Sequence, residues 1–155
     1  MIKIIDFSAK HSTLFRELNE AWITEHFELE ESDQKMLNDP KGYILDQGGV
    51  ILIAEMDDRV VGTCALIKME GDQFELAKMA VDPSAQGRSI GYKLGLAILE
   101  KAKSLGARTV FLETNSKLQP ALALYKKLGF KEIAGPESPY SRCNVQMELV
   151  LSYDS

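Results

Sequence analysis

Residues 86–91 combine residue types that could hold an anionic ligand. They follow an apolar run of strand length and precede apolar residues at helical spacing, so they are expected to begin a helix. The first N–H groups of a helix lack intrahelical partners, and the helix dipole adds partial positive charge. Gly87 and Gly91 let a ligand approach the backbone, and Arg88 adds a full charge. The segment predicts a pyrophosphate cradle, with an ordinary strand-to-helix turn as the alternative.

A strand and a helix must position this loop, and the flanking residues predict both. Residues 74–81 form an apolar-rich run that ends at Pro83, because proline cannot donate to a strand ladder. Apolar residues then recur at helical spacing over residues 88–105. A regular pleat in the strand would separate its side chains into two faces, with Glu75, Ala77, Met79 and Val81 on one and Phe74, Leu76, Lys78 and Ala80 on the other.

The rest of the chain alternates strands and helices without a repeat, a linker or a composition shift. We therefore expect one domain over residues 1–155. Its elements are predicted as strand 1–7, a helix from residue 12, helix 32–37, loop 41–49, strands 50–56, 59–69 and 74–81, helix 88–105, strand 108–114, helix 118–128, and strands 130–134 and 143–151. The order β-α-α-β-β-β-α-β-α-β-β predicts an α/β (α+β) fold with a mixed sheet flanked by helices.

Composition and residue spacing argue against several kinds of partner: nucleic acid, metal ions and membranes. The formal charge of −5 argues against a nucleic-acid partner, which would need a clustered basic surface. Cys64 and Cys143 have apolar neighbours and are expected to be reduced thiols. His11 and His26 stand apart, and no spacing of Cys and His suits a metal. The sequence has no signal-peptide core or membrane-spanning run, so a cytoplasmic protein without a membrane partner is expected.

Two stretches of the sequence resemble the GNAT superfamily of N-acetyltransferases. Its acetyl-CoA signature, Gln/Arg-x-x-Gly-x-Gly/Ala, is matched by Gln86 and Gly91, whereas Ser89 replaces the usual middle glycine. The superfamily also carries an asparagine after its fifth strand and a tyrosine on the next helix, where this chain has Asn115 and Tyr125. The order of elements matches over roughly the whole chain.

The resemblance implies a GNAT-like, mostly antiparallel sheet of about seven strands with about four helices. It also implies acetyl-CoA as co-substrate, without a metal. In the superfamily, a bulge splays the fourth strand and lets its backbone bind the pantetheine arm. The residues expected to bind the cofactor are Met79, Ala80, Val81, Gln86, Gly87, Arg88, Ser89, Ile90, Gly91 and Asn115. By itself, Asn115 also reads as an ordinary turn residue.

The resemblance further assigns catalytic roles. Tyr125 would protonate the leaving CoA thiolate, although its helical spacing alone would make it a core tyrosine. An alkyl ammonium has a pKa of about 10, so a group must accept its proton near neutral pH. Glu75 is the first choice for this base, and Glu113 or a water chain is the alternative. Since no Ser-His-Asp or Cys-His arrangement is evident, direct attack of the amine is expected.

The sequence says less about the amine that accepts the acetyl group. Trp22, His26, Tyr140 and Arg142 are candidates for its pocket, and Arg142 could clamp a carboxylate. This favours a small primary amine such as an amino acid or another carboxylated amine. The alternatives are a protein lysine or N-terminal amine as acceptor, and a non-catalytic acyl-CoA sensor. A homodimer is compatible with the sequence, which contains no feature that decides it.

Overall fold

The computed structural model describes residues 1–135, 138 and 140–151. Its strands are β1 (Ile2–Asp6), β2 (Val50–Met56), β3 (Arg59–Lys68), β4 (Gln73–Val81), β5 (Thr109–Thr114), β6 (Lys131–Ile133) and β7 (Val145–Val150). Its α-helices are α1 (Ser12–His26), α2 (Glu31–Asn38), α3 (Ile90–Ser104) and α4 (Gln119–Leu128). Short 3-10 turns at Ala9–His11 and Pro83–Ala85 and a π-helical turn at Lys41–Leu45 complete the described elements.

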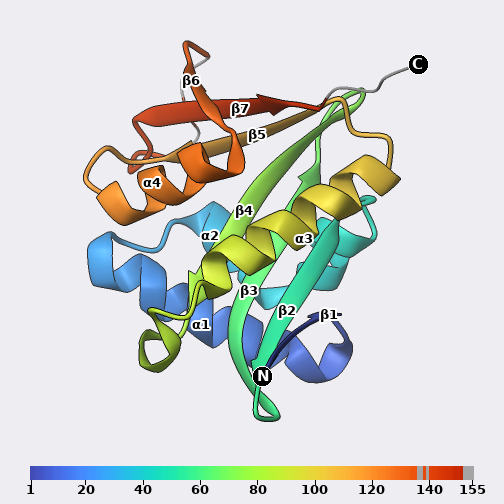
Figure 1. Cartoon of the computed structure of the whole chain (residues 1–155), viewed down its shortest axis with the longest axis vertical. Helices are drawn as coiled ribbons and strands as arrows, with labels where there is room; N and C mark the ends of the chain where they lie inside the picture. The colour runs from blue at the N-terminus through green and yellow to red at the C-terminus, as the bar shows by residue number, and fades with distance from the viewer. Residues whose placement is uncertain (136–137, 139, 152–155) are drawn as a thin grey trace.

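The described strands form one sheet in the order β1-β2-β3-β4-β5-β7-β6. The β4–β5 pair is parallel, and the other neighbouring pairs are antiparallel. Figure 1 shows α3 and α4 in front of the sheet and α1 and α2 behind it. The predicted α/β class, mixed sheet and order of α-helices and strands are confirmed.

Two apolar cores hold the helices on the sheet. In front, Ile90, Leu94 and Ile98 of α3 pack against β2, β3 and β4 in a cluster of buried side chains. Behind, Phe15 and Ile23 of α1 pack with Ile44 and the rear-facing residues of β2 and β3. Burial of these side chains is the main favourable term for folding. It holds α3 on one face of the sheet and α1 on the other.

β4 and β5 pair along a short length and then part. Their register covers Gln73–Glu75 on β4 and Thr109–Phe111 on β5. Beyond that point β4 contains a bulge, because Thr63 faces Ala80 whereas Ala65 faces Ala77, which leaves both Lys78 and Met79 opposite Cys64. Lys78 has φ +51° at the bulge. The sheet therefore opens between two neighbouring strands.

The bulge overturns part of the predicted pleat. Lys78 reaches Asp33 on the α2 side of the sheet, and Met79 packs against the front cluster with Phe74 and Leu76. The two residues thus lie on the faces opposite to those predicted, because one extra residue in a strand reverses the alternation that follows it.

Several other predicted bounds differ from the observed ones, and two of these differences have a clear physical cause. α3 begins at Ile90 and not at residue 88, because Gly87 (φ +84°) and Ser89 (φ +59°) have left-handed backbone conformations that no helix contains. The predicted loop at 41–49 begins with the π-helical turn, which buries Ile44 completely in the rear core.

Candidate active site

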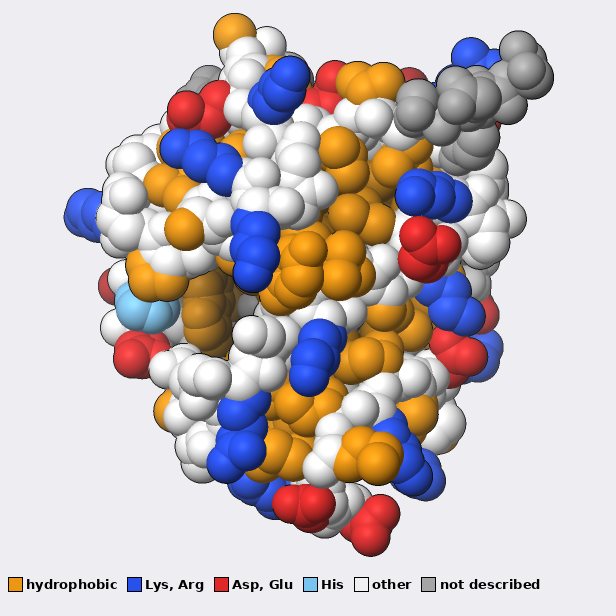
Figure 2. Space-filling view, viewed as in Figure 1, with side chains coloured by type: hydrophobic (Ala, Val, Ile, Leu, Met, Phe, Trp, Pro, Cys, Tyr) orange, Lys and Arg blue, Asp and Glu red, His pale blue; other side chains and the backbone are white. Residues whose placement is uncertain are grey.

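A groove lies between the start of α3 and α4. Figure 2 shows a hollow with an apolar floor at this place. Most residues that line the groove come from three places: the end of β4 and the following loop, the first turn of α3, and one face of α4. Trp22 of α1 adds to them. They include Met79, Val81, Gln86, Gly87, Ser89, Ile90 and Gly91 of the predicted cofactor site, together with Trp22, Ala85, Tyr92, Pro120, Ala121, Leu124, Tyr125 and Lys127.

The glycines of this loop have different physical roles. A Cβ added to Gly87 would meet no atom within 4 Å, so this position faces open space beside the groove. A Cβ at Gly91 would lie 3.2 Å from Leu124, so the small size of Gly91 serves the packing of α3 against α4. Gly87 and Ser89 are both left-handed. Such a loop presents successive N–H groups to an anion, in addition to those of the first turn of α3.

Lys127 and Tyr92 extend the groove beyond the predicted residues. The Lys127 Nζ lies 4.2 Å from the centre of the Tyr92 ring, an arrangement that holds the ammonium at the groove. Sequence reasoning missed both, because they belong to different helices. Ala80 and Arg88 of the predicted set are not among the described lining residues. Ala80 is buried, and Arg88 is exposed.

A second, narrower cavity of about 80 Å³ occupies the opening between β4 and β5. Its walls come from α1, β4, β5, α4 and the segment before β7. It is lined by Asn19, Trp22, Ile23, Phe27, Glu75, Leu76, Ala77, Lys78, Met79, Glu113, Thr114, Asn115, Leu118, Tyr125, Tyr140, Arg142 and Cys143. Trp22, Met79 and Tyr125 also line the groove, so the two hollows meet at these side chains.

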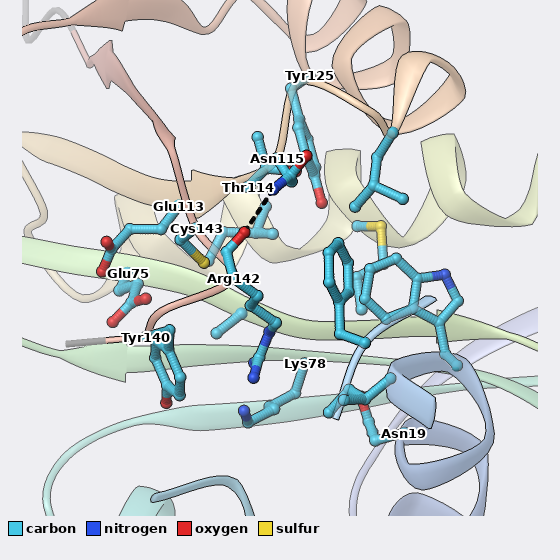
Figure 3. A pocket seen from close by; sticks show the side chains of 17 residues that line it. Asn19, Glu75, Lys78, Glu113, Thr114, Asn115, Tyr125, Tyr140, Arg142 and Cys143 are labelled. Carbon is cyan, nitrogen blue, oxygen red and sulfur yellow. Dashed lines mark hydrogen bonds between the residues drawn. The ribbon is translucent and has the colours of Figure 1, made fainter. Parts of the chain in front are cut away.

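Tyr125 lies at this junction. Its ring packs edge-on against Phe130 with ring centres 6.2 Å apart, and Figure 3 shows its hydroxyl pointing into the cavity. Burial raises the pKa of Tyr125 well above its usual range. The hydroxyl therefore stays protonated near neutral pH and is available as a donor. The ring packs as that of a core tyrosine does, while the hydroxyl faces the cavity (Figure 3), so the geometry is compatible with the acid role, which stays a prediction.

Glu75 and Glu113 lie side by side on the diverging strands (Figure 3). Burial, together with the negative charge of Glu113, raises the pKa of Glu75 to about 7, while Lys78 acts in the opposite direction. The Gln146 Nε2 lies 3.5 Å from a carboxylate oxygen of Glu113. A carboxyl with a pKa near neutrality suits a general base, so Glu75 has the electrostatics expected of its predicted role.

A buried ion-pair network closes the rear of the cavity. Asp33 of α2 is fully buried and binds Lys78 at 2.6 Å and both terminal nitrogens of Arg142 at 2.6 and 2.8 Å. Glu30 binds the same guanidinium at 3.2 Å. Burial by itself would raise the pKa of Asp33, but the hydrogen bonds from Arg142 and Lys78 lower it to about 2. Asp33 therefore joins α2, the β4 bulge and the segment before β7.

The network changes the role expected of Arg142. Its forked nitrogens already hold Asp33 and Glu30, so the two-pronged carboxylate clamp predicted from the sequence is occupied within the chain. The Tyr140 ring lies against the two cations, 4.5 Å from the Arg142 guanidinium and 5.2 Å from the Lys78 ammonium. Tyr140 does line the cavity, as expected.

Asn115 is also engaged within the chain. Its amide nitrogen donates to the Arg142 carbonyl at 2.6 Å (Figure 3), and its amide oxygen accepts from the Lys117 N–H at 2.9 Å. The turn interpretation therefore describes this geometry. By fastening the segment before β7 to the end of β5, Asn115 shapes the cavity. Its amide keeps a second N–H and a second oxygen lone pair, and its contact with the pantetheine arm stays a prediction.

Asn19 and Thr63 support the bulge from behind. The Asn19 amide donates to the Thr63 hydroxyl at 3.1 Å, and this hydroxyl donates to the Lys78 carbonyl at 3.1 Å. Sequence reasoning found neither residue, nor Asp33, because no local pattern marks a polar side chain for burial. Of the two α1 candidates, Trp22 lines both hollows, whereas His26 lies beside Trp22 with its ring centre 5.5 Å away and lines neither.

Among the described residues, no group of histidine, cysteine or carboxylate side chains has the arrangement of a metal site. Helices in the described part of the chain are too short or too polar to cross a bilayer.

Comparisons with known proteins identify the family. The family model described as "Acetyltransferase (GNAT) family" matches residues 12–130. Uncharacterized N-acetyltransferase YvbK of Bacillus subtilis is 34% identical over 102 residues, which cover 64% of this chain and 66% of the relative. IAA acetyltransferase of Azospirillum brasilense is 38% identical over 90 residues, which cover 57% and 58%. The matches thus span little more than half to about two thirds of these relatives.

Solved structures cover nearly the whole chain. A GNAT-family acetyltransferase from Staphylococcus aureus has a TM-score of 0.89 at 24% identity, over 98% of this chain and 100% of the other. An acetyltransferase from Bacillus subtilis in complex with CoA has a TM-score of 0.74 at 25% identity, again over 98% and 100%. Since the family model covers most of the residues that build the groove and the cavity, the chain belongs to the GNAT family of acetyltransferases.

Proposed function

We propose that the chain is an N-acetyltransferase that transfers the acetyl group of acetyl-CoA to the primary amine of a small molecule. The observation that carries this proposal is the junction of groove and cavity at Met79, Trp22 and Tyr125, which lets two substrates meet. Family membership and the crystallised Bacillus subtilis relative with CoA support the choice of cofactor.

The groove would bind both the phosphate groups and the pantetheine arm of the cofactor. The left-handed loop at Gly87 and Ser89 and the first turn of α3 suit the pyrophosphate, and Lys127 suits a further phosphate. The opened edge of β4 at Met79 and Val81 is free of β5 and can pair with the amide groups of an extended arm, as a strand would. This arrangement leads the thioester towards Tyr125.

The chemistry then needs two proton movements. The acceptor ammonium first gives a proton to Glu75, directly or through water, and the neutral amine attacks the thioester carbonyl carbon. An N–H of Met79 or Ala80 would stabilise the oxyanion. As the carbon–sulfur bond breaks, the nitrogen loses its second proton and the thiolate sulfur gains one from the Tyr125 hydroxyl, which is replenished from the nitrogen.

The narrow, walled cavity favours a small acceptor over a lysine within a folded protein, which would need an open groove. The carboxylated amines expected from the sequence lose their support, because Arg142 is already bound by Asp33. A cytoplasmic location and a homodimer stay predictions.

The test is amine-dependent release of CoA thiol from acetyl-CoA, with mass spectrometry of the amine product, by the wild type and by Tyr125→Phe. We expect an acetylated amine and slower turnover in the variant. Tight acetyl-CoA binding without release for any primary amine would instead favour the acyl-CoA sensor.

A further inference from the structure

The charges around the cavity are unevenly compensated. Its two cations, Lys78 and Arg142, are matched by the two carboxylates of Asp33 and Glu30. Their side chains are 5% and 13% exposed, and that of Asp33 is 0% exposed, so these pairs are largely removed from water. At such low exposure the pairs screen one another, and the network presents little net charge to a ligand.

Glu75 and Glu113 have no such compensation. Both line the cavity, and within the described residues neither forms a salt bridge within the usual 4 Å limit. The neighbour of Glu113 is the neutral amide of Gln146. The ligand-facing charge of the cavity is therefore negative. The other lining residues include the aromatic side chains of Trp22, Phe27 and Tyr140, and aromatic faces also attract cations.

Size limits the ligand further. A water molecule needs roughly 10–15 Å³ of cavity volume, so the cavity of about 80 Å³ has room for about five to eight heavy atoms. The reacting amine must lie near Met79 and Tyr125, where the cavity meets the groove. A short unbranched chain would extend from there along β4 towards Glu75 and Glu113 (Figure 3).

We infer that the acceptor is a short aliphatic amine with a second cationic group and no carboxylate, and that Asp33 sets this selectivity by neutralising Lys78 and Arg142. Glu113 binds the second ammonium, and the reacting amine, which lies at the other end of the molecule near Tyr125 (Figure 3), passes its proton to Glu75 through water. The inference rests on the proposed acetyl transfer, and it adds the charge that the acceptor must carry at its far end.

Three probes of equal chain length test the inference: cadaverine, pentylamine and δ-aminovalerate, whose far ends are cationic, neutral and anionic. The first readout is kcat/KM for CoA release by the wild type. The second is binding of each probe to the enzyme–CoA complex by calorimetry, which does not depend on turnover. We expect cadaverine to exceed pentylamine by about tenfold in both, and δ-aminovalerate to be weakest. Equal values for the three probes, or the reverse order, would overturn the inference.

Two variants locate the selectivity. Glu113→Gln should lower kcat/KM for cadaverine about tenfold more than for pentylamine, because only the diamine loses a partner for its far ammonium. The change that the variant makes in the pKa of Glu75 affects both amines alike, so the ratio isolates the binding role. Asp33→Asn should raise the preference for δ-aminovalerate over cadaverine by about tenfold, because it frees the two cations. Asp46→Asn, which removes the exposed partner of Lys41, is the matched control and should alter no ratio. Unchanged ratios in both test variants would contradict the assignment.

The experiments distinguish a failure of the proposed acetyl transfer from a failure of the inferred charge selectivity. If no amine releases CoA, acetyl transfer is wrong, while the calorimetric order of the three probes still decides the charge selectivity. If amines are acetylated without regard to their far end, the enzyme assignment stands and the charge inference fails. Should Asp33→Asn not fold, Glu113→Gln and the wild-type probe series carry the test.

Discussion

The groove and the cavity are built in different ways, although they share three side chains. Most of the groove comes from one continuous stretch, residues 79–92, with a second wall from α4. The cavity gathers side chains from α1, β4, β5, α4 and the segment before β7, fastened to α2 by Asp33. The groove depends on local backbone conformation, whereas the cavity depends on contacts between distant residues. The residues of the groove can therefore be predicted from local sequence, whereas those of the cavity cannot.

The energetics differ in the same way. The strain of a left-handed residue is confined to the loop that contains it, so replacing one glycine there displaces only a few neighbouring atoms. The cavity instead relies on charges held away from water, where removal of one partner leaves the others without compensation. Substitutions in the cavity should therefore have larger effects than substitutions in the groove.

The largest effect is expected from Asp33→Asn. It leaves Lys78 and Arg142 buried without their shared carboxylate, so the free energy of unfolding should fall by about 3–5 kcal/mol in urea titrations. Asp46→Asn removes an exposed pair and should change it by less than about 1 kcal/mol. Similar losses in the two variants would show that the cavity is no more dependent on ion pairs than the surface.

Tyr125→Phe should reduce kcat by about a hundredfold with acetyl-CoA binding unchanged, because the ring packing on Phe130 survives and only the proton donor is lost. Steady-state kinetics and calorimetry with CoA separate the two quantities. Tyr43→Phe, at an exposed tyrosine, is the control. An unchanged kcat would remove Tyr125 from the acid role.

Glu75→Gln should lower kcat/KM by about tenfold at pH 8, since water can still accept the proton. In the wild type, kcat/KM should rise with pH up to about 7 and then level, and the variant should lose this step. Glu132→Gln, on the exposed strand β6, should keep it. A step retained in Glu75→Gln would assign the base elsewhere.

The same carboxyl also makes a prediction for stability. Its folded-state pKa of about 7 lies above the usual value, so between about pH 4.5 and 7 the folded state binds more protons than the unfolded state. Its contribution to stability must then fall as the pH rises through this window. Urea titrations at pH 5 and 8 should show a smaller loss for Glu75→Gln than for the wild type. Equal losses would mean that Glu75 ionises normally.

The smallest effect is expected in the groove. Gly87→Ala adds a Cβ at φ +84° in open space and should raise KM for acetyl-CoA about fivefold, with kcat kept and about 1 kcal/mol of stability lost. Gly71→Ala has a similar backbone conformation (φ +62°) in the turn between β3 and β4, so it should lose similar stability without changing KM. Equal KM values for acetyl-CoA in the two variants would show that Gly87 takes no part in cofactor binding.

Local patterns, together with the family resemblance, predicted the fold and many of the residues that line the groove. Pro83, the glycine loop and the periodicity of α3 mark their elements in sequence, and β2 was predicted at its observed bounds. The family resemblance implied a bulge in β4, but the residues of the strand do not mark it at Lys78, since its support comes from Asn19, Thr63 and Asp33 on other elements. The same reason explains Arg142, whose partner lies 109 residues earlier in the chain.

The central claim is that groove and cavity form one continuous site, and binding of a bisubstrate ligand tests it most directly. The ligand joins the sulfur of CoA to a primary alkylamine through a two-carbon acyl bridge, and calorimetry compares it with CoA. We predict that it binds at least about a hundredfold more tightly, because both halves are held at once. Equal affinity for the two ligands would mean that the cavity does not receive the amine, and would contradict the account.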